Sequence, residues 1–430
     1  MLRYVSSNTT RALQFFQAAR FGSTLLISIL LVRAIVDDVA VAHYEQWIFA
    51  ANLLSFFWAM GLTKAALSFY PTLSVDQRSS FLFSSTFLLS LIGIGSGILG
   101  YFFASNLQGG LGLSAFPYWT EAMILLVFSM PLSLIETRFT LLGQSKKIVN
   151  YSVLSYSSIL LAALVCFLVF KDEYLFIQVY LIWTLVRWIY LQVLNWGKLD
   201  SLLLKKYFYY SIPLVLHIIL GNGMEYIDGI LVNHYFEVES FPIFRYGARE
   251  LPISSILVGG IVASLIPLYL QNKEGTLSSF KTKISKLIRW VFPMAMILIL
   301  VSPLLYKLVY GEAFIESAYL FNIYLLILVS RVLLPQIIIQ AKHQNKILVY
   351  SALIELLVNI GLSIFLLQYF GLIGIAMATW VAYMVNKVIL LGYVKFKMKV
   401  PLSSYLNQRV YILYSICLLL SFWISWQVYH

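Results

Sequence analysis

The chain has 430 residues, of which 61% are hydrophobic, 16% are aromatic and only 11% are charged, and its formal net charge is +12. Soluble domains carry roughly 25% charged residues, so this composition and the mean hydropathy of +0.85 exclude an ordinary soluble protein. The positive charge is spread over short segments between apolar blocks, which argues against a nucleic-acid-binding protein. Cys166 and Cys417 both lie in apolar blocks, so we expect neither a disulfide nor a metal site.

Apolar blocks of about 20 residues recur along the chain, and this is the length that crosses ~30 Å of hydrocarbon. The pattern predicts an all-α polytopic membrane protein. The expected spans are 13–36, 47–70, 81–104, 120–142, 149–170, 174–196, 208–234, 244–270, 287–310, 317–340, 349–369, 372–394 and 410–428. No small-residue cleavage site follows the first block, so we expect that span to be retained.

Basic residues gather in alternate loops, and acidic residues gather in the loops between them. One set of loops contains Lys146, Lys205 and Lys346, whereas the other contains Asp172 and Glu237. Because lysine and arginine stay in the cytoplasm, the N-terminus is expected inside and the C-terminus outside. We expect a multi-pass protein of the bacterial inner membrane.

An internal repeat suggests two similar halves. The sequence KIVNYSVL at 147–154 returns as KILVYSAL at 346–353, and SFYP at 68–71 is echoed by SLIP at 264–267. Parallel repeats about an axis along the membrane normal are a transporter architecture. We therefore predict two six-helix lobes related by pseudo-two-fold symmetry. They are lobe 1–197, a cytoplasmic linker 198–206, lobe 207–395 and an extra C-terminal span within 396–430.

Nothing in the sequence indicates an enzyme. No G-x-x-x-x-G-K-[ST] motif is present, the loops are too short for a nucleotide-binding domain, and the five histidines are scattered. We expect no cofactor, and energy from H+, Na+ or the membrane potential rather than from ATP.

Charged residues inside the spans are the candidate functional residues, because each costs at least ~2.5–3.5 kcal/mol at a bilayer centre. Arg245 and Arg249 lie one helical turn apart and repel each other unless an anion lies between them, which predicts a diphosphate site. Alternatively, Arg245 reaches lipid headgroups and Arg249 pairs with an acid. Further cavity cations or structural ion-pair partners are Arg187, Arg331 and Lys387. Coupling or counter-charge candidates on one face of the seventh span are His217, Glu225 and Asp228.

The sequence YFGLIGIAMATW at 369–380 resembles the "yGi.GaAiAt" turn of polysaccharide-repeat-unit (O-antigen and capsule) flippases. These belong to the multidrug/oligosaccharidyl-lipid/polysaccharide exporter superfamily. The resemblance covers about residues 10–395. Other matching positions are Ser211–Ile212–Pro213, Asp228, Ile266–Pro267, Asn359 and the segment 310–314. Relatives that flip the peptidoglycan lipid precursor carry essential cations on spans one, two and eight, where this chain has Arg20, Lys64 and Arg249.

The resemblance implies export of a polyprenyl-diphosphate-linked oligosaccharide to the outer leaflet by alternating access, for surface polysaccharide synthesis. The partners it implies are the lipid-linked glycan, membrane lipid, and the polymerase and chain-length machinery. The excess of bases over acids in the spans suits an anionic substrate. The alternative is a cation-coupled multidrug or metabolite antiporter of the same superfamily, in which acids should dominate the cavity.

Overall fold

The computed structural model describes residues 7–35, 37–113, 116–249, 276–342, 344 and 346–429. Within these ranges every regular element is a helix, and eleven helical segments are long and apolar enough to cross a membrane. The prediction of an all-α, multi-pass membrane protein is confirmed. Two compact units are present: unit 1 comprises Met1–Asn222 and Asn233–Phe241, and unit 2 comprises Gly223–Val232 and Pro242–His430.

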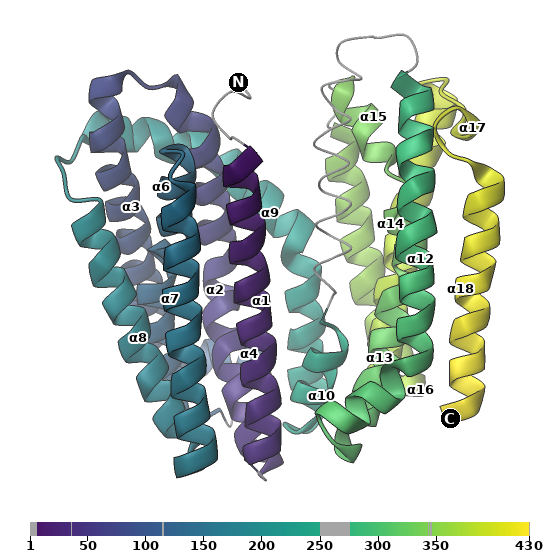
Figure 1. The fold of residues 1–430 in the computed structure, drawn as a ribbon, viewed down its shortest axis with the longest axis horizontal. Helices are drawn as coiled ribbons and strands as arrows, with labels where there is room; N and C mark the ends of the chain where they lie inside the picture. The colour runs from purple at the N-terminus through teal and green to yellow at the C-terminus, as the bar shows by residue number, and fades with distance from the viewer. Residues whose placement is uncertain are drawn as a thin grey trace. The chain divides into compact units, whose positions relative to one another are not determined.

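The elements of unit 1 are shown in purple to teal in Figure 1. They are α1 (Ser7–Ala34), α2 (Asp38–Phe69), α3 (Val75–Phe102), α4 (Ala104–Gly110), α5 (Trp119–Ser129), α6 (Ser133–Leu141), α7 (Ser145–Leu164), α8 (Glu173–Leu194) and most of α9 (Ser201–Tyr235). The elements of unit 2 are residues 223–232 of α9, most of α10 (Ser240–Gly247), α12 (Thr276–Val309), α13 (Ile315–Leu326), α14 (Leu328–Arg331), α15 (Pro335–Ala341), α16 (Lys346–Gly392), α17 (Leu402–Tyr405) and α18 (Gln408–Tyr429).

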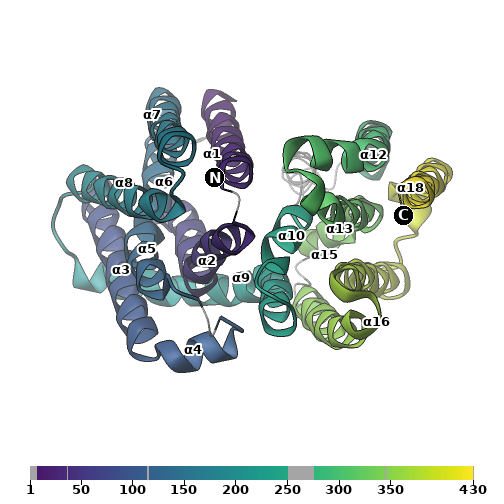
Figure 2. The same ribbon diagram turned by 90° about the horizontal axis from the view of Figure 1, so that it is seen from below.

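In unit 1, α2 packs against α3, α5 and α6, and α1 packs along α7, as Figure 2 shows end-on. The helices α3 and α5 approach each other closely at three glycines. A Cβ atom on Gly93 would lie 3.0 Å from the carbonyl oxygen of Val127, and one on Gly97 or Gly100 would collide with Val127 or Met123. Small residues at this spacing let two membrane helices pack closely, where dispersion contacts must replace the hydrophobic effect.

The helix α9 begins at Ser201, ahead of the predicted span at 208, and so includes residues 201–206 of the predicted linker. The sequence SLLLKK contains neither glycine nor proline and consists mainly of strong helix formers. Asp200 supports this start, because its carboxylate accepts a hydrogen bond from the backbone N–H of Leu203 at 2.9 Å.

The predicted thirteenth span is α18, and it packs against α12 as part of unit 2. Buried hydrogen bonds connect α12 with α13 and with α18. Ser302 of α12 donates to Asn322 Oδ1 of α13 at 2.6 Å, and Ser425 of α18 donates to the carbonyl oxygen of Ile299 of α12 at 3.0 Å. The predicted eighth span, 244–270, lies mostly outside the described residues. So do Ser264–Pro267 of the sequence repeat.

The helix α16 contains the predicted eleventh and twelfth spans, separated at Gly371. There φ is 58° and ψ is −137°, a conformation that side chains with a Cβ avoid. Gly374 then lies so close to the backbone of Leu366 that no Cβ could be accommodated. These two glycines are the ones in the YFGLIGIAMATW segment, so the geometry of the turn explains both of them.

We expect Gly371→Ala to lower the thermal stability of the purified protein, because an alanine at this backbone conformation costs about 1–3 kcal/mol. Gly361→Ala is the matched control on the same helix, since nothing lies within 4 Å of the position that its Cβ would occupy. It should be neutral or slightly stabilising in the same melting experiment. Equal melting temperatures for the two variants would contradict the assigned turn.

Candidate functional site

The first half of α16 has an unusual buried face. Its buried residues are Ser351, Glu355, Asn359 and Ser363, all polar and spaced by four, whereas its exposed positions include Leu353, Leu357 and Phe365. Residues at i and i+4 lie on one face of a helix. This polar stripe therefore faces other protein helices, while the apolar faces are available to lipid.

The stripe meets Asp228 of α9, whose side chain is only 2% exposed. Thr379 donates to Asp228 Oδ2 at 2.7 Å, and Asn359 donates to Thr379 Oγ1 at 2.9 Å. Tyr324 of α13 donates to the same carboxylate oxygen at 3.3 Å. Side chains from the seventh, tenth, eleventh and twelfth predicted spans thus converge on one buried carboxylate.

The oxygen atoms around Asp228 suit a small hard cation. Asn359 Oδ1 and Ser363 Oγ are buried, and within the described residues neither makes a hydrogen bond. A buried polar atom without a partner is costly, and Asn359 is joined to Asp228 through Thr379, with Ser363 one turn further along the same face of α16. These atoms indicate a ligand near the carboxylate. Carboxylate, amide and hydroxyl oxygens are donors for hard cations, and a single negative charge balances a monovalent one.

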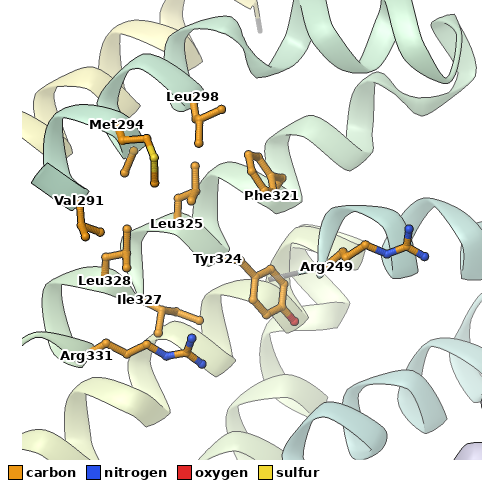
Figure 3. A pocket seen from close by; sticks show the side chains of 11 residues that line it. Arg249, Val291, Met294, Leu298, Phe321, Tyr324, Leu325, Ile327, Leu328 and Arg331 are labelled. Atoms are coloured by element: carbon orange, nitrogen blue, oxygen red, sulfur yellow. The ribbon is translucent and has the colours of Figure 1, made fainter. Parts of the chain in front are cut away.

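A pocket lies between α12, α13, α14 and the residues that follow α10 in unit 2, and Arg249 and Arg331 both line it. The remaining wall is mostly aliphatic and aromatic, with Val291, Leu298 and Phe321 among its residues. Figure 3 shows Tyr324 between the two arginines, with the apolar side chains gathered on one side. Arg249 also lies over the ring of Tyr246, with its Cζ atom 5.4 Å from the ring centroid. The pocket therefore combines two guanidinium groups with an apolar wall.

A second charged cluster in unit 2 joins the two halves of α16. Asn386 donates to Glu355, and Lys387 donates to Gln336 at 3.2 Å. Glu355 is near enough to Lys387 and Arg331 to interact with both electrostatically. Because hydrogen bonds and opposite charges surround Glu355, this cluster supports the packing of α14, α15 and α16.

Unit 1 holds a cluster of its own, built from α1, α6, α7 and α8. Arg187 donates to the hydroxyl of Tyr151 at 2.8 Å, and its Cζ atom lies 4.1 Å from the ring centroid of Trp183. Glu136 interacts electrostatically with both Arg20 and Arg187. The side chain of Arg20 is exposed and makes no hydrogen bond or ion pair with the described residues. Arg20 and Arg187 thus share Glu136 as a counter-charge, and Arg187 is also held by aromatic partners.

Lys64 of α2 and His217 of α9 form a further pair in unit 1. Lys64 is near enough to His217 to influence it electrostatically, and both side chains are exposed. Neither makes a hydrogen bond or ion pair with the part of the chain that the structure describes. The sequence predicts His217 and Asp228 on one face of a helix. In the structure His217 lies near Lys64 in unit 1, whereas Asp228 accepts hydrogen bonds from Thr379 and Tyr324 in unit 2.

The predicted site residues therefore fall into several groups. Arg249 and Arg331 share a pocket, Lys387 belongs to the cluster with Glu355, and Asp228 has its own oxygen site. Arg245 lies on α10 but is not among the pocket residues. The side chain of Glu225 lies outside the described residues, so its predicted role as a counter-charge stays a prediction.

Sequence reasoning did not identify Tyr324, Thr379 and Ser363 as site residues. Thr379 and Asn359 stand out in the sequence only as parts of the family resemblance. A signal was present in the spacing of Ser351, Glu355, Asn359 and Ser363, because polar residues at every fourth position of an apolar span mark a face directed at protein. No comparable signal marks Tyr324, since tyrosines are frequent throughout this chain.

No family model matches the chain, and no curated protein matches it. Among solved structures, the lipid II flippase MurJ in an inward closed conformation is similar, with a TM-score of 0.63 and 18% identity over 96% of this chain and 98% of that chain. An inward-facing multidrug resistance MATE family transporter of the MOP superfamily is similar with a TM-score of 0.64 and 12% identity, over 90% of this chain and 95% of that chain.

A third similar structure is a MOP superfamily transporter from Pyrococcus furiosus, described as having a binding pocket of reversed polarity. Its TM-score is 0.60, with 11% identity over 93% of this chain and 95% of that chain. At these identities the likeness establishes the fold. The chain has the fold of MOP superfamily transporters along nearly its whole length.

Proposed function

We propose that the protein is a flippase that moves a polyprenyl-diphosphate-linked oligosaccharide from the cytoplasmic to the outer leaflet. The observation that carries the proposal is the pocket lined by Arg249 and Arg331 against an otherwise largely apolar wall. Guanidinium groups bind phosphate oxygens in a bidentate manner, and an apolar wall suits the first isoprene units of a lipid carrier. MurJ, one of the structures with this fold, is a lipid II flippase.

Unit 1 supports the same substrate class, because Arg20 and Lys64 are exposed cations on predicted membrane spans. We propose that they bind the anionic headgroup during alternating access, with a contribution from Arg245 at the mouth of the path. The proposal also places the protein in the bacterial inner membrane, with its N-terminus inside. The end product would be a surface polysaccharide. The polymerase and chain-length machinery would be the partners that receive the glycan.

The oxygen site at Asp228 supports coupling to a monovalent cation, with Na+ as the first candidate and a proton on Asp228 as the second. An inside-negative membrane potential would itself favour outward movement of a diphosphate, by ~2.3 kcal/mol per charge per 100 mV. A cation site would add a second source of free energy and would let the ion favour one conformation over another.

Ligand-induced thermal stabilisation of the purified protein tests the substrate class. Farnesyl diphosphate is expected to raise the melting temperature, because a ligand that binds only the folded state stabilises it. Farnesol, which lacks the phosphates, and tetraphenylphosphonium, an organic cation, are expected to have little effect. Stabilisation by the organic cation without an effect of the diphosphate would favour the multidrug or metabolite antiporter instead.

A further inference from the structure

We propose that Tyr324 links the cation site to the anion pocket, so that each ligand increases the affinity for the other. This inference rests on the proposed function, because it takes the pocket to be the diphosphate site and Asp228 to be the cation site. It assigns a positioning role to a residue that belongs to both.

Tyr324 is the residue through which the two sites meet. It lines the pocket that contains Arg249 and Arg331, and Figure 3 shows it between these two side chains. Its hydroxyl group donates to Asp228 Oδ2, in the other site. Ligand binding at either site therefore changes the surroundings of the same phenol group.

Two hydrogen bonds from the described residues reach Asp228 Oδ2, and they differ in length. The bond from Thr379 is 2.7 Å and the bond from Tyr324 is 3.3 Å. Hydrogen bonds to a carboxylate from hydroxyl groups are strongest at about 2.5–2.7 Å, so the Tyr324 bond is the weaker one. It is the contact that a competing interaction would break first.

A phenol group has one O–H to donate. While that proton points to Asp228, it is not available to a phosphate oxygen in the pocket. A cation at Asp228 neutralises the carboxylate and weakens its hold on the Tyr324 hydroxyl, which can then donate to the diphosphate. The reverse also holds, since an anion that takes the hydroxyl removes one of the hydrogen bonds that compete with the cation for Asp228 Oδ2. Linkage requires the two effects to be equal in size.

The linkage can be measured as a ratio of two affinities in the full-length protein. Farnesyl diphosphate binding is titrated in NaCl and in choline chloride at the same ionic strength, so that screening is constant. For the wild-type protein we expect binding about tenfold tighter in NaCl, within the range usual for coupled sites. For Tyr324→Phe, which keeps the ring and removes the hydroxyl, we expect the ratio to fall to about one.

Tyr319→Phe is the matched control. Tyr319 lies on the same helix, is absent from the pocket lining and donates its hydroxyl to the backbone oxygen of Tyr429. This variant should keep the wild-type ratio. Thermal stabilisation by Na+ alone should persist in Tyr324→Phe, because Thr379 and Asn359 still surround Asp228.

A wild-type ratio retained by Tyr324→Phe would overturn the role of Tyr324. A wild-type protein that binds both ligands with a ratio of one, or below one, would also overturn the linkage but leave the proposed function intact. Absence of farnesyl diphosphate binding in the wild-type protein would remove both proposals. The two failures are therefore distinguishable in one set of titrations.

Discussion

Arg249→Ala is expected to abolish transfer of a lipid-linked oligosaccharide while the protein still reaches the membrane. Arg249 is one of two guanidinium groups in the pocket of unit 2, and alanine can provide neither its charge nor its hydrogen bonds. A hydrogen bond to a charged group contributes about 1.5–3 kcal/mol, so a bidentate contact accounts for at least a hundredfold in affinity. The measurement is movement of a fluorescent polyprenyl-diphosphate-linked sugar between the leaflets of reconstituted vesicles.

Arg289→Ala is the charge-matched control for this experiment. Arg289 lies on α12 in the same unit but is exposed and outside the pocket lining. Its replacement should leave transfer close to the wild-type rate. Normal transfer by Arg249→Ala in well-folded protein would rule out the pocket as the diphosphate site. An equal loss of transfer in both variants would show that transfer depends on the net charge of the protein rather than on the pocket.

Asp228→Asn is expected to abolish stabilisation of the protein by Na+. Asparagine keeps the size of the side chain and can still accept from Thr379, but it lacks the negative charge that balances a monovalent cation. The wild-type protein should gain about 1.4 kcal/mol of stability at a Na+ concentration ten times Kd. Melting in NaCl and in choline chloride measures the difference.

Glu355→Gln distinguishes the two buried carboxylates of unit 2. Glu355 lies on α16 one turn before Asn359, but it is placed with Asn386 and near Lys387 and Arg331. Cations close to Glu355 disfavour binding of another cation there, so this variant should keep the response to Na+. If Glu355→Gln loses the response and Asp228→Asn keeps it, the cation site is assigned to the wrong carboxylate. If acid raises the melting temperature of the wild-type protein and Na+ does not, the proton is identified as the coupling ion.

The candidate site could be predicted only in part, and the reason differs from residue to residue. Arg249, Arg331 and Asp228 stand out in the sequence because a charged side chain inside an apolar span costs free energy. Such a residue is therefore a candidate functional residue. The sequence does not show which charges share a site. Lys387 lies near Glu355, and Arg249 lines the same pocket as Arg331; helix packing decides both placements.

What the sequence determines by itself is the class of fold and the span pattern. Blocks of about 20 apolar residues predict helices in lipid, since a helix gives backbone N–H and C=O groups their partners within one segment of that length. Gly371 and Gly374 likewise mark the turn between two spans, because backbone geometry there admits no Cβ.

Only the tertiary structure decides that Tyr324 belongs to both sites. Its ring and its hydroxyl group meet different neighbours, one set from α12, α14 and the end of α10 and the other from α9 and α16. A single tyrosine among 29 carries no local mark of such a position. The physical reason is that helix periodicity predicts which face of a helix is buried, whereas the partners on that face depend on how neighbouring helices pack.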